Sequence, residues 1–246
     1  MSRVNLVLID SYEIDAQDRV RLVDRRARHL LDVLAVEPGQ QVAVGIIDGP
    51  SGQGEVLATD EQSVSLQLDC AQPERARNDV LLLAVPRPRI LARMFEHAAA
   101  LGFGHIVLFR SWRVEKSHLA SKLLEPAVQR QHLLRGLEQS RRTHVPSVAF
   151  HPLFRPFVED RLDLLPLPDS RFCAHPKANI HTADLQLTRG SPFALALGPD
   201  GGFLPYEVEQ LAARGFLPVQ FGPHPLRTES ALSAAWGQLD LLRHRG

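Results

Sequence analysis

Residues 192–242 carry one pattern twice. The apolar run 193–197 (FALAL) leads into the glycine-rich loop 198–203 (GPDGGF), and a helical pattern follows. The apolar run 216–221 (FLPVQF) leads into the loop 222–227 (GPHPLR), again before a helical pattern. Runs of this length and composition are typical of buried strands. We therefore predict two glycine-rich strand ends side by side, where a ligand lies against bare backbone.

The loops exclude the common phosphate-binding motifs. Neither ends in the Lys-Ser/Thr pair of a P-loop, neither follows the G-x-G-x-x-G dinucleotide pattern, and neither contains a lysine. An unrelated nucleotide enzyme with a glycine loop is therefore disfavoured. By itself, the first loop is equally consistent with glycines that only turn the chain after a strand.

The two loops together resemble a family signature. The residues are GPDGGF at 198–203, then Glu207, then FGPHPLRTESA at 221–231. They resemble the pattern G-P-E-G-G-F and L-G-x-R-I-L-R-x-E-T-A of the ribosomal RNA small subunit methyltransferase E family, in the SPOUT superfamily. The resemblance extends more weakly over nearly the whole chain. Departures from the family pattern mark a divergent member; they are Ala35, Ala100, His224 and Pro225.

This resemblance implies an enzyme that methylates N3 of a uridine in 16S ribosomal RNA of the small ribosomal subunit. It implies S-adenosylmethionine as the methyl donor, bound in a deep trefoil knot built from the last strands and helix. It also implies a homodimer, with the last helix, 228–243, in the interface; packing of that helix within one chain is the alternative. The rival hypothesis is a non-catalytic RNA-binding or ribosome-assembly protein that retains the knotted fold.

The cofactor site is expected on the two loops and on a third that follows residues 170–174. Glycines there allow backbone groups to approach adenine and ribose, and apolar side chains supply walls. A lone histidine at a strand end is more often structural, so a purely structural role is the alternative for His175. The predicted cofactor-binding residues are His175, Leu197, Gly198, Pro199, Gly201, Gly202, Phe221, Gly222, Pro223 and Leu226.

Two side chains are candidates for catalysis. N3 of uracil carries a proton that must leave, so a cation that stabilises the uracil anion, or a base, would lower the barrier. Arg227 at the mouth of the second loop is the candidate cation, and Glu229 is the candidate base. Alternatively, Glu229 is an ordinary acidic residue in the first turn of a helix, behind Thr228 as the N-cap.

The composition is that of an ordinary globular protein. The 246 residues suffice for one large or two modest domains, and the formal net charge is zero, so RNA contacts must come from local basic patches. Nothing resembles a signal peptide or a membrane span. Cys70 and Cys173 have no spacing that suggests a metal site or a disulfide. We expect a cytoplasmic protein without a metal and without a membrane partner.

The first 72 residues predict a small β-barrel. Candidate strands lie at 4–9, 41–47, 54–58 and 63–68, and residues 24–34 between the first two are predicted to be helical. The family carries a PUA-like barrel that holds RNA, and His29 with Val33 and Leu34 follows its H-x-x-x-V-L-R motif except at Ala35. The predicted RNA-binding residues here, beside Arg19 and Arg21, are Arg25, Arg26, Arg28 and His29; the alternative is a solvated helix face.

Residues 73–246 predict an α/β domain. The composition of residues 70–78 predicts a linker, and residues 80–85 form a continuous apolar run typical of a parallel strand covered on both faces. A helix at 90–101, closed by Gly102, and a strand at 104–109 complete a βαβ unit. A long helix at 122–142 matches a family element at Glu138, Gln139 and Arg142. Arg142 is a further RNA-binding candidate, unless it only complements the helix dipole.

Overall fold

The protein is described here from a computed structural model, which covers residues 6–245 and divides into two compact units. One unit contains the chain up to Ala76 together with Leu134–Val145; the other contains Arg77–Leu133 and the chain from Pro146 onward. Val4 and Asn5, which the sequence places in the first strand, lie outside the described residues.

The first unit is a five-stranded sheet with short helical segments beside it. Its elements are β1 (Val7–Ile9), η1 (Ser11–Glu13), β2 (Arg19–Leu22), α1 (Arg25–Arg28), η2 (His29–Val33), β3 (Gln41–Ile46), β4 (Ser51–Thr59) and β5 (Val64–Gln72). The strand order is β1-β3-β4-β5-β2, with β1 and β3 parallel and the other pairs antiparallel.

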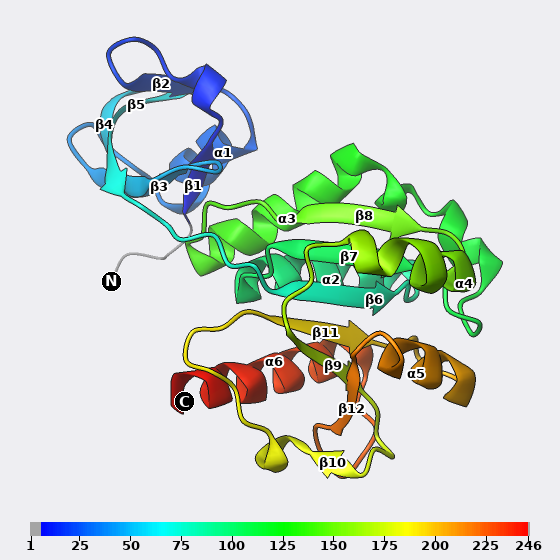
Figure 1. The fold of residues 1–246 in the computed structure, drawn as a ribbon. Coiled ribbons are helices and arrows are strands. Elements are labelled where there is room, and N and C mark those ends of the chain that lie inside the picture. The colour runs from blue at the N-terminus through cyan, green and yellow to red at the C-terminus, as the bar shows by residue number, and fades with distance from the viewer. Residues whose placement is uncertain (1–5, 246) are drawn as a thin grey trace. The chain divides into compact units, whose positions relative to one another are not determined.

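This sheet is curled but not closed. In the part of the chain that the structure describes, no pairing joins its outer strands β1 and β2, so it is a half-barrel rather than the closed barrel that the sequence predicted (Figure 1). Its concave side encloses a core of fully buried aliphatic side chains, among them Ile9, Leu22, Val44 and Leu66.

Strand β2 was missed in the sequence. Arg19-Val20-Arg21-Leu22 alternates exposed arginine with buried aliphatic residues and pairs with β5. This alternation is typical of a half-buried strand. The sequence interpretation assigned the two arginines to a basic cluster and predicted no strand here. Arg19 and Arg21 therefore lie on the outer face of a strand.

The second unit contains the remaining elements. They are β6 (Val80–Ala84), α2 (Pro88–Leu101), β7 (His105–Phe109), η3 (Lys116–Ala120), η4 (Lys122–Leu124), α3 (Pro126–Ser140), β8 (Ser147–His151), α4 (Phe154–Pro156), η5 (Phe157–Arg161), η6 (Leu162–Leu164), β9 (Ser170–Ala174), β10 (Ile180–His181), η7 (Thr182–Asp184), β11 (Phe193–Leu197), α5 (Pro205–Ala212), β12 (Leu217–Gln220) and α6 (Thr228–Arg245). The last residues of α3 belong to the first unit.

The sheet of the second unit has seven strands in the order β10-β12-β9-β11-β6-β7-β8, and every pair is parallel. All five residues of β6 and of β11 are buried, as expected for strands covered on both faces. The arrowheads of β6, β8 and β11 point the same way in Figure 1. The carboxyl ends of the strands therefore meet at one edge of the sheet.

The two glycine-rich loops are not on neighbouring strands. Strand β9 pairs with β11 on one side and with β12 on the other, so the end of β9 lies between the two loops. The sequence prediction of two adjacent strand ends is wrong in this respect, because pairing between distant segments determines the order of strands. The third loop expected at the cofactor site, which follows β9, therefore lies between the two glycine-rich loops.

The predicted helices are present with corrected ends. Helix α2 begins at Pro88 and ends before Gly102, whose φ of 87° is the left-handed conformation expected at that position. The helix predicted at 122–142 is interrupted, since a 3-10 turn precedes Pro126, where α3 begins. Arg141, with a φ of 59°, follows its last residue. None of the described helices is long and apolar enough to span a membrane.

A buried ion pair stabilises the second unit at the far end of α6. Arg243 Nη1 donates to both oxygens of Asp79 at 2.9 Å, and Asp79 also accepts from the amide of Phe193 at 3.1 Å. The side chains of Arg243 and Asp79 are only 5% and 1% exposed. Arg243 also donates to Asp240 and lies over the Phe193 ring. This network joins the end of α6 to the start of β6 and of β11.

Candidate active site

A cavity of about 1140 Å³ lies in the second unit, where β9, β11 and β12 end. Most of its wall comes from the residues that follow each of these three strands. The segment after β12 continues into the first turn of α6, which also lines the cavity. Most predicted site residues line it, namely His175, Leu197, Gly198, Pro199, Gly201, Gly202, Phe221, Gly222, Leu226, Arg227 and Glu229. Pro223 is not among the lining residues.

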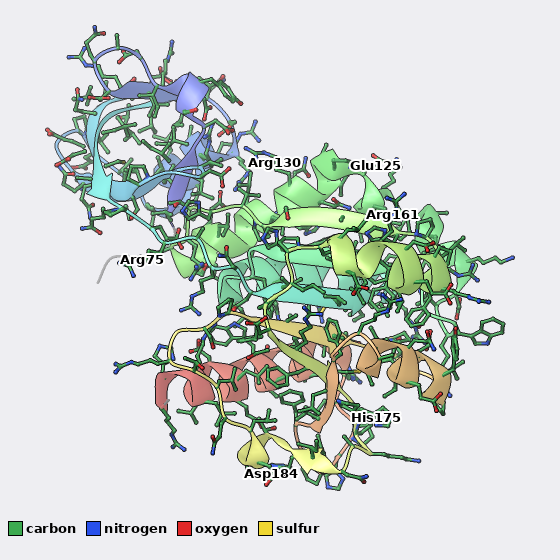
Figure 2. The ribbon with its side chains drawn as sticks, in the orientation of Figure 1. Arg75, Glu125, Arg130, Arg161, His175 and Asp184 are labelled. Atoms are coloured by element: carbon green, nitrogen blue, oxygen red, sulfur yellow. The ribbon has the colours of Figure 1, made fainter. Side chains whose placement is uncertain are left out.

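His175 lies between the two glycine-rich loops because β9 lies between their strands. Its amide donates to the carbonyl of Val219 in β12 at 3.0 Å, and Figure 2 shows it in the region of β10 and β12. Burial, together with the charge of Lys177, lowers the pKa of His175, so the imidazole is neutral at pH 7. A neutral imidazole in the cavity wall is compatible with an uncharged or a cationic ligand.

The first glycine-rich loop is tightly turned. A Cβ on Gly198 would lie 3.0 Å from the amide nitrogen of Phe203, closer than side chains normally approach backbone. Gly202 has a φ of 69°, a left-handed conformation, and its amide donates to Pro199 at 2.7 Å. Leu197 and Phe203 are buried beside the loop. The loop therefore offers bare backbone next to an apolar wall.

Arginines from two other strand ends hold this loop. Arg87, after β6, lies 3.2 Å from Asp200, and Arg113, after β7, donates to the carbonyl of Gly201. Arg87, Arg113 and Arg89 all line the cavity. Sequence analysis missed them, although the signal was present: residues that follow β6 and β7 must reach the same edge of a parallel sheet as the glycine-rich loops.

The two candidate catalytic residues are close together at the start of α6. Arg227 is exposed, lines the cavity and directly precedes the helix. The Glu229 carboxylate is 15% exposed and lies 3.6 Å from Arg93 of α2. Thr228 is itself the first helical residue and donates to Asp200 at 3.5 Å, so it ties α6 to the first loop. The expectation that Thr228 is the N-cap is therefore corrected.

Glu207 organises the chain beside the cavity. Its carboxylate is buried and accepts from the amide of Leu204 at 2.9 Å and from the amide of Trp112 at 2.8 Å. These bonds join the start of α5 to the segment after β7. The sequence showed Glu207 as part of the family signature, and the structure gives it this architectural role.

In the first unit, Arg26 is committed to internal contacts. Its guanidinium donates to Glu13 at 2.5 and 2.8 Å, to Asp24 at 3.1 Å and to the carbonyl of Leu8 at 2.8 Å. The bond to Glu13 is the main cause of the raised pKa of Arg26. Its side chain is only 14% exposed, so Arg26 stabilises the half-barrel.

The other predicted RNA-binding residues have more varied surroundings. Arg25 forms a double hydrogen bond with Glu138 at 2.6 and 3.0 Å yet is 57% exposed. Arg142 pairs with Glu74 at 3.1 Å and is 18% exposed. Arg28 is exposed and His29 half-buried. Among these predicted RNA-binding residues the exposed cations are Arg25 and Arg28, and Arg19 and Arg21 of the same basic cluster are exposed on β2.

The part of the chain that the structure describes offers neither a metal centre nor a reactive thiol near the cavity. Among residues 6–245, no group of three or more His, Cys, Asp or Glu side chains is arranged to hold a metal ion. Burial, and next to it the charge of Glu207, raises the pKa of Cys173 in β9 to about 12, so this thiol stays neutral. Arginine, carboxylate, histidine and backbone groups line the cavity.

Comparison with known proteins defines the class. The family model described as RNA methyltransferase domain matches residues 73–240, which include the whole cavity. The chain belongs to this RNA methyltransferase family.

Relatives narrow this class. Ribosomal RNA small subunit methyltransferase E of Treponema pallidum is 28% identical over 94% of this chain and 89% of its own length. Ribosomal RNA small subunit methyltransferase E 1 of Borreliella burgdorferi is 22% identical over 94% of this chain and 95% of its own. The resemblance to the ribosomal RNA small subunit methyltransferase E family is thus confirmed.

Solved structures agree on the fold. Ribosomal RNA small subunit methyltransferase E of Neisseria gonorrhoeae, bound to S-adenosyl methionine, has a TM-score of 0.79 at 21% identity and covers 98% of both chains. A putative methyltransferase of Legionella pneumophila, in complex with the same cofactor, has a TM-score of 0.75 at 21% identity and covers 98% of both chains. Both units of this chain therefore have counterparts in proteins of known structure.

Proposed function

We propose that the protein is an S-adenosylmethionine-dependent methyltransferase that methylates N3 of a uridine in 16S ribosomal RNA. The observation that carries the proposal is the cavity at three strand ends, in which tightly turned glycine backbone lies beside apolar side chains. The named relatives are ribosomal RNA methyltransferases, and two proteins of this fold were crystallised with the cofactor.

The residues present suit this cofactor. It carries no phosphate, and neither glycine-rich loop contains a lysine. Backbone groups of Gly198, Gly201 and Gly222 would hold the adenosine, with Leu197 and Leu226 against it. The proposed cofactor-binding set is completed by four further lining residues, His175, Pro199, Gly202 and Phe221. Pro223, which follows Gly222 in the second loop, stays in the set by its place in the sequence motif only. When bound, the cofactor supplies an electrophilic methyl group.

The chain contributes positioning and charge. N3 of the uracil must lose a proton, and negative charge then spreads to the ring carbonyls. In this proposal Arg227, at the mouth of the cavity, stabilises that charge, and Glu229 accepts the proton. Arg93, 3.6 Å from Glu229, orients the carboxylate. Holding the acceptor ring in line supplies much of the remaining acceleration.

For substrate binding, we propose that residues 1–72 are a PUA-like RNA-binding domain and residues 73–246 the catalytic SPOUT domain. Arg25, Arg28 and His29 of the first unit, with Arg142, would contact phosphates of the small-subunit RNA. Arg26 supports them through its internal bonds rather than by direct contact.

We further propose that the last strands and α6 form the trefoil knot typical of the SPOUT superfamily, and that the protein is a homodimer with α6 in its interface. The proposed substrate is in the ribosome, which makes the cytoplasm the expected location. The dimer is testable by sedimentation at micromolar concentration, where a monomer would contradict it.

Calorimetric binding of S-adenosylmethionine tests the cofactor site. Gly198→Ala forces a methyl group to within 3.0 Å of the Phe203 amide and should weaken binding about tenfold or more. The matched control is Gly237→Ala in α6, where an added Cβ meets nothing within 4 Å. A folded wild-type protein that does not bind the cofactor would overturn the enzyme proposal in favour of a non-catalytic RNA-binding or ribosome-assembly protein.

The target atom has its own test. Undermethylated small subunits are incubated with the protein and the methyl donor, and the RNA nucleosides are analysed by mass spectrometry. 3-Methyluridine is the expected product. Any other methylated nucleoside would leave the methyltransferase class intact and refute the assignment to uridine N3.

A further inference from the structure

Trp112 is a large aromatic side chain that is 80% exposed on a well-anchored segment. Its neighbours Ser111 and Val114 are only 1% and 3% exposed, and its amide donates to the buried Glu207 carboxylate at 2.8 Å. The backbone is therefore fixed while the indole points to solvent. An exposed ring on a fixed backbone loses little conformational freedom when it binds a ligand.

A second exposed aromatic residue lies close to the Trp112 segment. Tyr206, 46% exposed, directly precedes Glu207 in the first turn of α5. Because Glu207 accepts a hydrogen bond from the Trp112 amide, the two segments are in contact at this point. Trp112 and Tyr206 together are here called the aromatic platform.

A cation lies beside the platform. Arg113 follows Trp112, donates to the carbonyl of Gly201 and lines the cavity. Arg155 donates to the Glu159 carboxylate at 2.8 Å, and this hydrogen bond is the main cause of its raised pKa. The Arg155 side chain is 74% exposed. The platform therefore begins at the rim of the cavity, next to Arg113.

We propose that the aromatic platform stacks an unpaired base of single-stranded RNA next to the nucleotide that enters the cavity. The inference rests on the proposed function, since it assigns a position to the RNA around the reacting nucleotide. Aromatic side chains bind bases through their faces without regard to sequence, and neighbouring arginines bind the phosphates between those bases.

The charges favour RNA over a protein partner as the occupant. Aromatic side chains and arginines also occur in protein interfaces, so it is the cations at the rim of the neighbouring cavity that favour RNA. The cavity beside the platform is rimmed by further cations, Arg87, Arg89 and Lys177, against the carboxylates of Asp200 and Glu229. A polyanion threaded across this rim would meet the cations and the rings in succession.

Binding of a short single-stranded oligoribonucleotide that contains uridine tests the platform. We expect Trp112→Ala to weaken binding by roughly 5- to 150-fold, as one lost stacking contact does, and Tyr206→Ala to weaken it less. The matched control is Leu164→Ala, another exposed apolar residue of the second unit (73% exposed) that does not line the cavity. This control should bind RNA like the wild type.

Fluorescence gives an independent measurement. The chain has two tryptophans, and Trp236 lies under Arg77 with its indole nitrogen buried. In the Trp236→Phe variant, Trp112 is the sole indole, and stacking of a base on it should quench its emission on addition of RNA. Emission that does not change at an RNA concentration that saturates binding would overturn the proposal.

The remaining outcomes separate this proposal from the proposed function. Trp112 does not line the cavity, so Trp112→Ala should bind S-adenosylmethionine like the wild type. If the wild type binds no cofactor, the enzyme proposal fails, while the RNA measurements still test the platform. RNA binding by Trp112→Ala within twofold of the wild type refutes the platform. A change in its oligomeric state with unchanged RNA affinity would assign the surface to a second copy of the chain instead.

Discussion

Removing the Arg243 side chain should destabilise the second unit strongly. In the variant Arg243→Met the aliphatic volume is nearly kept, but Asp79, 1% exposed, loses the guanidinium that donates to both its oxygens at 2.9 Å. Truncating one partner of a buried ion pair costs about 3–5 kcal/mol, because the other charge is left buried without compensation. The amide of Phe193 alone cannot replace that partner.

Differential scanning calorimetry measures the effect. At about 2–4 °C per kcal/mol for a chain of this size, the transition of the second unit should fall by roughly 6–20 °C. Arg245→Met, an exposed arginine in the same last turn, is the control and should change stability by less than about 0.5 kcal/mol.

A double variant separates charge from packing. Asp79→Asn with Arg243→Met removes both charges and keeps an acceptor for the Phe193 amide, so it should be more stable than Arg243→Met alone. A loss below about 1 kcal/mol in the single variant, or a double variant that is the sum of the singles, would refute the assignment of this pair as an isolated buried charge network.

Three further predictions concern the site. Glu207→Ala leaves two amides without their acceptor and should cost about 2–4 kcal/mol, with Glu207→Gln less harmful; equal stabilities in chemical denaturation would contradict this. The pKa of His175 is lowered by burial and by Lys177, so the unfolded chain binds the proton more readily: stability should be full above about pH 6.5 and fall below it, and His175→Asn should lack that slope. Arg227→Ala should lower kcat about 100-fold or more with little change in KM, and Glu229→Gln should do likewise if Glu229 is the base. Unchanged kcat with a loss of about 0.3–1 kcal/mol in stability would instead make Glu229 a helix-terminal residue only.

Local patterns were sufficient for most elements. The continuous apolar run before Pro86 predicted a buried parallel strand, and Gly102 predicted the end of α2; both are present. The glycine-rich loops predicted a ligand site, and nearly all their residues line one cavity. These features depend on residues close together in the chain, where periodicity and backbone preference decide the outcome.

The errors have a common origin in long-range contacts. Arg26 remains a predicted RNA-binding residue, but no local pattern showed that its guanidinium pairs with Glu13 and Asp24. The half-barrel itself stays open because β1 and β2 do not pair among the described residues. Whether an arginine forms an intramolecular ion pair, or whether a sheet closes into a barrel, depends on partners that are distant in the sequence and that no local pattern specifies.

The sequence by itself determined the parallel strands and the glycine-rich loops, because these follow from composition and from spacing along a short stretch of chain. The family followed from the resemblance of the two loops to a known signature. Only the tertiary structure decided that β9 lies between β11 and β12, which places His175 in the cavity wall. It also decided that Arg87 and Arg113 hold the first loop and that Trp112 emerges beside it. The carboxyl ends of all these parallel strands lie at one edge, but the order of the strands, which depends on the packing of the whole sheet, determines which ends are neighbours there.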